Sequence, residues 1–214
     1  MKTTIKMKTT NRLLNLTLTI ILIIFYSCSK DDDNISDKVA SISGKIENFA
    51  APQTGGQGQP IGGEFSKFSF KTGKKTTDDN WDIAFRGTTI AINGGEKTGT
   101  ADEPDRTGNA GASIFSGTLA ELKTIDGLVF NQDSGTSFAI PTGSDNGWYN
   151  YNFRTNVISP IPGKVLVIRT HDDKYAKVEI LSYYLDQDSS NPAGGRNYTF
   201  NYVYNPNAGE ISFE

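Results

Sequence analysis

Residues 164–184 read KVLVIRTHDDKYAKVEILSYY, and this stretch contains two strand patterns on either side of a polar turn. The four apolar residues 165–168 form a continuous run, which is typical of a strand buried on both faces. After the turn at 171–174 the pattern has a period of two: Ala176, Val178 and Ile180 share one face, and Lys177 and Glu179 point away from it. Two such strands around a short polar turn predict a β-hairpin.

The same period of two recurs along most of the chain. Aromatic and β-branched residues occupy alternate positions in residues 68–70, 81–92 and 198–204, and clusters of Gly, Asn and Asp bound these stretches. Such a pattern specifies strands and hairpins. A first strand is expected at residues 41–49. We therefore predict an all-β protein of mainly antiparallel strands, with residues 41–214 as a single domain.

Two segments depart from the strand pattern. Residues 51–63 (APQTGGQGQPIGG) are rich in Gly, Pro and Gln, and they are predicted to form a mobile loop. Residues 119–123 offer the only stretch that suits a helical turn. Little helix is therefore expected.

The N-terminus has the features of a secretory signal. An apolar stretch at residues 13–26 follows four basic residues, Lys2, Lys6, Lys8 and Arg12, and precedes Ser27-Cys28-Ser29. This stretch is shorter than the about 20 apolar residues that cross a bilayer. We predict a lipoprotein signal peptide over 1–27, cleavage before Cys28 and lipidation of Cys28, with 28–40 as an acidic tether. The alternative is that Cys28 is an ordinary thiol.

The tether and the charge balance bear on location and partners. Residues 30–34 (KDDDN) resemble the acidic tags that send some Gram-negative lipoproteins to the cell surface, the alternative being a merely solvated tether. We expect a chain anchored by lipid in the outer membrane and facing the cell exterior. Removing residues 1–27 removes four of the 21 basic residues and none of the 24 acidic ones, which leaves a net charge of −7. This balance argues against nucleic acid as a partner, because phosphates require a basic surface.

Few side chains are available for catalysis or metal binding. The single histidine, His171, lies in the predicted turn beside two aspartates and is expected to be solvated. A zinc site needs several His or Cys ligands, and a Ser-His-Asp site needs a histidine oriented in a cleft. Residues 186–190 have the oxygen spacing that begins a calcium loop, but the glycine and glutamate of such a loop are missing. No catalytic residue and no metal site is predicted.

Residues 148–153 (WYNYNF) are the most aromatic stretch of the chain. In an extended strand, Trp148 lies on one side, and Tyr149, Tyr151 and Phe153 lie on the other. One interpretation is an edge strand whose aromatic residues cover the sheet. The other is a binding surface for a flat apolar or sugar-like ligand, and the sequence favours neither.

Several segments together resemble the HmuY-like haem-binding lipoproteins. The likeness is strongest in KVLVIRT and DKYAKV, within residues 164–178, and in the pair Tyr183-Tyr184. It extends to FSF, NWDIAF, NGG and GASIFSG, within residues 68–117, and to the tyrosine-rich strand 198–204. The resemblance covers roughly residues 64–205. It implies a one-domain antiparallel β fold on a lipid anchor, which captures haem outside the cell and passes it to an outer-membrane transporter.

The resemblance also implies where haem is held. Relatives place the iron between two axial side chains, histidines in some members and methionines in others. The corresponding segments here, about 128–141 and 148–164, contain neither residue type, and both methionines belong to the signal peptide. Because a tyrosine phenolate also ligates haem iron, Tyr149 and Tyr151 become the candidate haem-binding residues. No other cofactor is implied.

Three functions are compatible with these features. The first is a haem- or porphyrin-binding lipoprotein for iron acquisition, with a TonB-dependent outer-membrane receptor as partner. The second is a non-catalytic surface module that binds a glycan, a peptide or a receptor on the same scaffold. The third is a hydrolase, which the lone histidine and the lipidated cysteine disfavour. The sequence favours the first and predicts that the protein is not an enzyme.

Overall fold

A computed structural model describes residues 38–56 and 58–214. The predicted signal peptide, Cys28 and most of the tether lie outside the described residues. Residues Lys38–Glu214 form one compact unit. Within the described ranges, no helix is long and apolar enough to cross a membrane.

A five-stranded antiparallel sheet contains the hairpin predicted from residues 164–184. In spatial order, the strands are β1 (Ile42–Ala50), β13 (Gly195–Asn205), β12 (Tyr175–Tyr184), β11 (Lys164–Arg169) and β8 (Gly111–Ser116). Strand β11 pairs with β12 from Leu166 opposite Val178 to Arg169 opposite Tyr175. The first strand and the tyrosine-rich strand predicted from the sequence are thus neighbours in one sheet.

A second antiparallel sheet has the order β5 (Lys74–Thr76), β4 (Ser66–Ser69), β6 (Ile83–Arg86) and β7 (Thr89–Ile92). The described residues contain only two helical turns, the 3-10 segments η2 (Leu185–Gln187) and η3 (Pro192–Gly194). The prediction of an all-β fold is confirmed. Residues 119–121 form a turn and residues 122–123 are irregular, so the helical turn that residues 119–123 could suit is not formed.

Two small hairpins complete the fold: β2 (Thr54–Gly56) with β3 (Gln59–Gly62), and β9 (Tyr149–Asn152) with β10 (Val157–Pro160). The mobile loop predicted at 51–63 instead contains a paired hairpin, so the prediction of a loop was wrong. Gly55 has a positive φ of 70°, and a Cβ there would lie 1.8 Å from the carbonyl oxygen of Pro60. The glycine that suggested a loop instead allows two backbones to approach closely.

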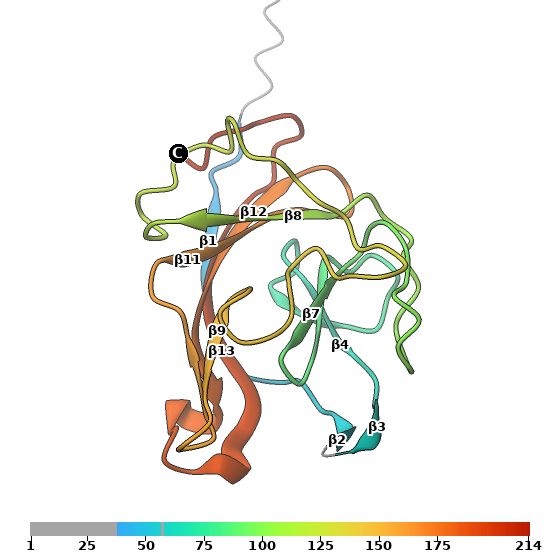
Figure 1. Ribbon diagram of the computed structural model, residues 1–214. Helices are drawn as coiled ribbons and strands as arrows, with labels where there is room; N and C mark the ends of the chain where they lie inside the picture. Colours follow the sequence, from blue (N-terminus) through green and yellow to red (C-terminus); the bar gives the residue numbers. More distant parts are fainter. Residues whose placement is uncertain (1–37, 57) are drawn as a thin grey trace, which may run out of the picture. The chain divides into compact units, whose positions relative to one another are not determined.

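The two larger sheets pack face to face around an aromatic core (Figure 1). The ring of Phe200 in β13 lies 5.4 Å from that of Phe68 in β4 and 5.7 Å from that of Phe85 in β6. Most of the alternate residues predicted to share a face point into this core: Phe68, Phe70, Ile83, Phe85, Tyr198, Phe200, Tyr202 and Tyr204. Trp81, which was predicted to share a face with Ile83 and Phe85, instead packs with Phe65, Ala84 and Ala91 in a separate cluster, because it precedes β6 rather than continuing its alternation. This arrangement is a β-sandwich.

The apolar run of β11 is buried on both faces, as predicted. Leu166 and Ile168 point into the sandwich core, whereas Val165 and Val167 point to a second cluster on the outer face of the sheet. That second cluster also contains Leu122, Ile125 and Phe213. The segments around residues 119–128 and the C-terminus therefore form a layer over the five-stranded sheet.

Lys177 lies under this outer layer. It points away from the core, as predicted, but its side chain is only 6% exposed. Its Nζ donates hydrogen bonds to the carbonyl oxygens of Leu119 and Leu122 at 2.8 and 2.6 Å, and lies 4.9 Å from the centre of the Phe213 ring. Burial lowers the pKa of Lys177. The polar face of β12 is thus a second buried surface, because the chain returns to cover it.

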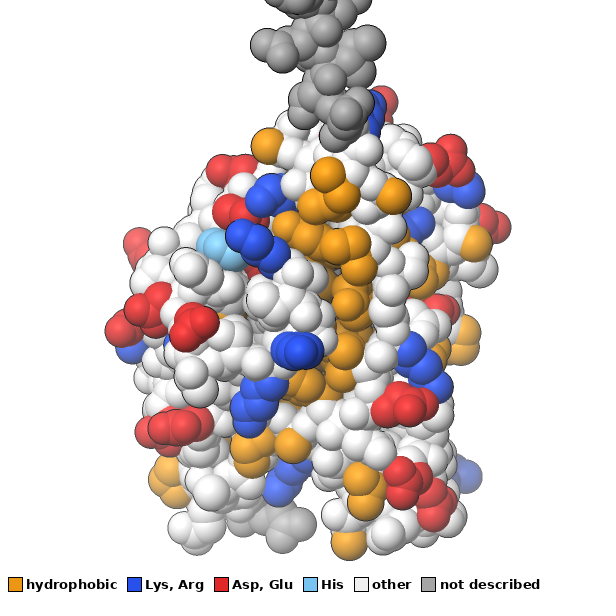
Figure 2. All heavy atoms as spheres, turned by 180° about the vertical axis from the view of Figure 1, so that it is seen from behind, with side chains coloured by type: hydrophobic (Ala, Val, Ile, Leu, Met, Phe, Trp, Pro, Cys, Tyr) orange, Lys and Arg blue, Asp and Glu red, His pale blue; other side chains and the backbone are white. Residues whose placement is uncertain are grey.

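The edge strand β1 covers the sandwich incompletely. Its residues Ile42 and Ile46 pair with Tyr204 and Phe200, whose side chains point into the core. Ile46 is half-buried against that core, and Ile42 is exposed. On the reverse side of the molecule, Figure 2 shows an apolar strip bordered by Lys and Arg side chains. Apolar surface therefore reaches solvent on that side.

Candidate functional site

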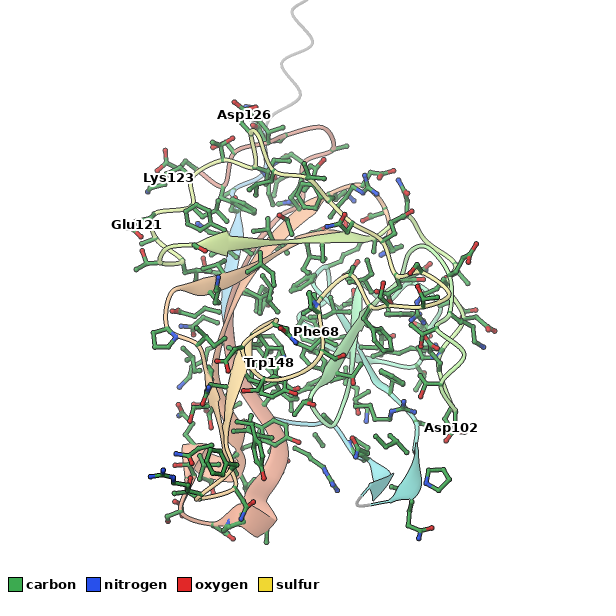
Figure 3. The ribbon with its side chains drawn as sticks, in the orientation of Figure 1. Phe68, Asp102, Glu121, Lys123, Asp126 and Trp148 are labelled. Atoms are coloured by element: carbon green, nitrogen blue, oxygen red, sulfur yellow. The ribbon has the colours of Figure 1, made fainter. Side chains whose placement is uncertain are left out.

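The β9–β10 hairpin begins inside the aromatic core. The Trp148 ring lies 4.9 Å from that of Tyr149 and 5.1 Å from that of Tyr198, and its Nε1 donates a hydrogen bond to the carbonyl oxygen of Thr88 at 3.0 Å. Figure 3 shows Trp148 and Phe68 pointing into the interior. For Trp148 and Tyr149, the interpretation as aromatics that cover the sheet is correct.

Further along the same hairpin the aromatic side chains reach solvent. Tyr151 is 41% and Phe153 is 76% exposed, and no other aromatic residue in the described part of the chain is exposed to this degree. The Tyr151 hydroxyl donates a hydrogen bond of 2.6 Å to Oδ1 of Asn156. The Arg154 guanidinium lies 5.7 Å from the centre of the Phe153 ring. A phenol, an aromatic face and a cation therefore lie together at the hairpin tip.

The two candidate tyrosines occupy different environments on one strand. Side chains alternate along β9, so Tyr149 and Tyr151 share a face, but Tyr149 is 8% exposed and packs within the core. Its neighbours in the core are phenols that keep their protons: burial raises the pKa of Tyr183 to about 12 and that of Tyr198 well above its ordinary value. Of the two candidates, Tyr151 is the one that a ligand can reach.

His171 is not the solvated turn residue that was expected. Its Nδ1 lies 2.7 Å from Oδ1 of buried Asp82, and its backbone N–H donates to the same oxygen at 3.1 Å. The other Asp82 oxygen accepts the N–H of Phe70 at 2.7 Å. The hydrogen bond to Asp82 raises the pKa of His171. The prediction failed because the β11–β12 turn folds against the second sheet, and no local pattern indicates that contact.

A metal at this position would need free ligand atoms. Ligand atoms of Asp82, His171 and Asp172 all lie within 4.8 Å of one another. However, both oxygens of Asp82 accept hydrogen bonds, and Asp172 is paired with Lys174 at 2.6 Å and with the hydroxyl of Thr170. The contacts of Asp82 and His171 therefore hold the β11–β12 turn against the second sheet.

The acidic loop at 186–190 has its carboxylates occupied in the same way. Oδ1 of Asp186 accepts a hydrogen bond from the side chain of Asn48 at 2.8 Å. Oδ1 of Asp188 accepts the backbone N–H and the hydroxyl of Ser190 at 2.9 and 2.6 Å. The first contact ties the loop to strand β1, and the second stabilises the turn itself.

A groove of about 840 Å³ lies among loops on the side of the second sheet. Volumes of this size are usual for small-molecule sites. Its lining residues carry hydroxyl, amide and apolar side chains and no charge: Thr98, Gly99, Thr100, Asn131, Gln132, Thr136, Ser137, Phe138, Ala139, Pro141 and Thr142. The segment 128–141, which the resemblance marks as one ligand-bearing region, supplies much of this lining.

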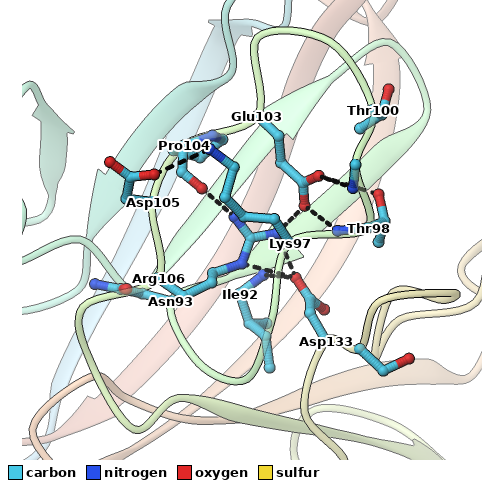
Figure 4. Close-up of polar contacts among 12 residues, drawn as sticks. Ile92, Asn93, Lys97, Thr98, Thr100, Glu103, Pro104, Asp105, Arg106 and Asp133 are labelled. Carbon is cyan, nitrogen blue, oxygen red and sulfur yellow. Dashed lines mark hydrogen bonds and ion pairs between the residues drawn. The ribbon is translucent and has the colours of Figure 1, made fainter.

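Three buried charged residues hold the two sides of the groove together (Figure 4). Arg106 forms ion pairs with Glu103 and with Asp133, the latter at 2.8 Å, and all three side chains are almost fully buried. Glu103 accepts the backbone N–H groups of Thr98 and Gly99 at 3.1 Å. We call Arg106, Glu103 and Asp133 the buried ion network.

Asp133 connects this network to the opposite side of the groove. Its carboxylate accepts the N–H of Ala139 at 2.8 Å and that of Ile92 at 3.1 Å. Burial raises the pKa of Asp133, while the Ala139 N–H and Arg106 act against that shift. No sequence pattern predicted this network, because nothing in the local sequence indicates that Arg106 and Asp133, 27 positions apart, form a pair.

Comparisons with known proteins returned matches of fold only. No family model and no curated protein matches the chain. A lipoprotein structure from Bacteroides fragilis is similar over 78% of this chain and 90% of its own, with 17% identity and a TM-score of 0.47. The apo form of a HmuY analogue from Tannerella forsythia is similar over 80% and 100%, with 12% identity and a TM-score of 0.48.

A structure described as a HmuY-like haem-binding protein from Bacteroides vulgatus is similar over 78% of this chain and 93% of its own, with 14% identity and a TM-score of 0.45. Two of these three structures are described as HmuY-type proteins. The likeness concerns the fold, and a fold does not determine a ligand.

Proposed function

We propose that this chain is a lipid-anchored binding protein that takes a flat apolar ligand of the haem or porphyrin class on the β9–β10 hairpin, with Tyr151 as the candidate iron ligand. One observation carries the proposal: Tyr151 and Phe153, two positions apart on the hairpin, are both exposed in a domain whose other described aromatics are buried or half-buried. Exposed apolar side chains grouped at one place mark binding sites in soluble domains.

The residues present fit haem on one side only. A phenolate at Tyr151 is a known type of haem ligand, the Phe153 ring offers a flat apolar contact, and Arg154 supplies a cation for a propionate group. The imidazole of His171 is held by Asp82. Tyr149 is enclosed by the core and is not part of the proposed site. With one ligand in place of two, we expect weaker haem binding than a bis-histidine or bis-methionine site gives.

The anchor and the partner belong to the same proposal. Cleavage before Cys28, lipidation at Cys28 and export to the outer surface of the outer membrane rest on the signal and the acidic tether. A TonB-dependent receptor would then be the recipient of the ligand. We propose no enzymatic activity, since within the described ranges the ring of His171 makes no hydrogen bond to a hydroxyl.

A haemin titration of the mature chain, carrying Cys28→Ser to prevent lipidation, tests this function. We expect a difference spectrum with a red-shifted charge-transfer band at micromolar haemin. Tyr151→Phe should abolish the band, whereas Tyr149→Phe should retain it. Tyr175→Phe, at a half-buried tyrosine that packs on Phe130, is the matched control. A flat titration, or a band that survives Tyr151→Phe, would overturn the proposal.

A further inference from the structure

We call the groove of about 840 Å³ the polar groove. The side chains that line it differ in chemistry from the exposed side chains of the β9–β10 hairpin. Hydroxyls come from Thr98, Thr100, Thr136, Ser137 and Thr142, and amides come from Asn131 and Gln132. The only aromatic ring is that of Phe138. A lining without charge offers nothing to phosphate or carboxylate groups, which are bound by Arg, Lys or clustered N–H groups.

Several of these polar groups are available to a ligand. Among residues 38–56 and 58–214, Asn131 and Thr142 form hydrogen bonds through their backbone groups alone, and both side chains are exposed. Gln132 donates through Nε2 to the carbonyl oxygen of Ala110 at 3.0 Å and to Oδ1 of Asn109 at 3.3 Å. Its own carbonyl oxygen thus remains an acceptor. A hydroxyl and amides can each donate and accept, which matches a ligand rich in hydroxyl groups.

Phe138 supplies an apolar wall beside these groups. Its ring is half-buried and lies 6.4 Å from that of Phe65, which supports it from the protein side. The ring and the neighbouring Pro141 are apolar, and the groups around them are polar. A sugar ring has the same division, because its C–H face is apolar and its edge carries hydroxyls.

The backbone around the groove is fixed in place. Asp133 holds Ala139 and Ile92 through their N–H groups, and Glu96 donates its N–H to the carbonyl oxygen of Asp133 at 2.8 Å. Gly95 has a φ of 79°, and a Cβ there would lie 1.9 Å from that same carbonyl oxygen. Loops held this way lose little conformational entropy when a ligand binds, which raises affinity.

From these features we propose that the groove is a binding site for a neutral carbohydrate, with Asn131, Gln132 and Thr142 as hydrogen-bonding residues and Phe138 as the stacking surface. The buried ion network acts as a positioning element for this site. No lining residue of the groove belongs to the β9–β10 hairpin, so carbohydrate binding in the groove does not depend on haem binding at the hairpin.

The test uses isothermal titration of the mature chain, with Cys28→Ser, against neutral oligosaccharides of three to six units built from glucose, mannose, galactose or xylose. We expect at least one to bind with a dissociation constant below millimolar. Asn131→Ala and Thr142→Ala should each weaken that binding by about tenfold or more, as expected when a ligand hydroxyl loses its partner. Tyr151→Phe should leave it unchanged.

Phe138→Ala should abolish binding, and Asn131→Ala covers the case in which loss of the ring impairs folding, because Asn131 is exposed. Amide shifts in the nuclear magnetic resonance spectrum should concentrate at residues 131–142. Absence of binding across the panel, shifts confined to the hairpin, or stronger binding of a sulfated or uronic oligosaccharide than of its neutral counterpart would each overturn the proposal.

Discussion

The β9–β10 hairpin and the polar groove present their side chains to solvent in opposite ways. At the hairpin tip, Tyr151 and Phe153 extend beyond the core, and the Tyr151 hydroxyl contacts only Asn156 of the same hairpin. In the groove, the backbone of both sides is tied to buried charges through Asp133 and Glu103. The hairpin therefore offers exposed aromatic side chains with few contacts of their own, whereas the groove offers polar groups on a backbone that is held by buried charges.

This difference bears on which ligands each region can select. Apolar contact is not directional, so an exposed aromatic pair tolerates many flat ligands. Hydrogen bonds in a fixed groove reject ligands that leave a buried group unpaired. The two regions are thus suited to different ligand classes. A mutation that destabilises one region and leaves the other intact should therefore weaken binding of one ligand class only.

The largest effect is expected from Asp133→Ala. This change removes the acceptor for two backbone N–H groups and leaves the buried Arg106 with Glu103 as its remaining ion-pair partner. Removing one member of a buried ion pair costs about 3–5 kcal/mol. The free energy of unfolding in urea should fall by that amount, and carbohydrate binding in the groove should weaken while haemin binding at the hairpin persists.

Asp105→Ala is the matched control for that prediction. Asp105 lies in the same loop and pairs with Lys97 at 2.9 Å, but both side chains are exposed. Exposed ion pairs contribute little to stability, so the urea midpoint should stay at the wild-type value. Equal midpoints for Asp105→Ala and Asp133→Ala would contradict the role assigned to the buried ion network.

A smaller, pH-dependent effect is expected at His171. Because its pKa is raised in the folded state, its pairing with Asp82 contributes stability that is complete below the unfolded pKa of about 6.5 and is lost as pH rises through the folded value. His171→Gln should remove this dependence and reduce stability by about 1–3 kcal/mol at pH 6. Urea midpoints between pH 5.5 and 8.5 would measure both effects. A variant with the wild-type pH slope would show that the slope comes from another group.

The smallest effect is expected from removing single hydroxyls along the aromatic region. Tyr198→Phe deletes a buried hydroxyl that donates to the carbonyl oxygen of Gly87 at 2.8 Å, so we expect a loss of about 1 kcal/mol. Tyr151→Phe deletes an exposed hydroxyl and should change stability by less than about 0.5 kcal/mol. Thermal unfolding of both variants compares the two positions directly. The reverse order would show that the hairpin tip is the more tightly held.

Sequence patterns identified the strands because their information is local. The continuous run 165–168 and the alternation at 198–204 both reflect which faces of a strand are buried, and the structure has them as predicted. The segment 51–63 was misjudged, since the same glycines suit a loop and a close hairpin. For the candidate site, residues 148–153 were recognised as notable, but the division between a buried Tyr149 and an exposed Tyr151 was not.

The sequence by itself determined the all-β class, the strands with a clear period of two or a continuous apolar run, and the expectation of a signal with lipidation at Cys28, because periodicity and N-terminal composition are properties of neighbouring residues. Only the tertiary structure decided the contacts between distant residues: the Asp82–His171 pair, the burial of Lys177 and the ion network around Asp133. The physical reason is that the energy of a buried charge depends on what surrounds it in space. The surrounding groups come from strands and loops that the chain brings together only when it folds.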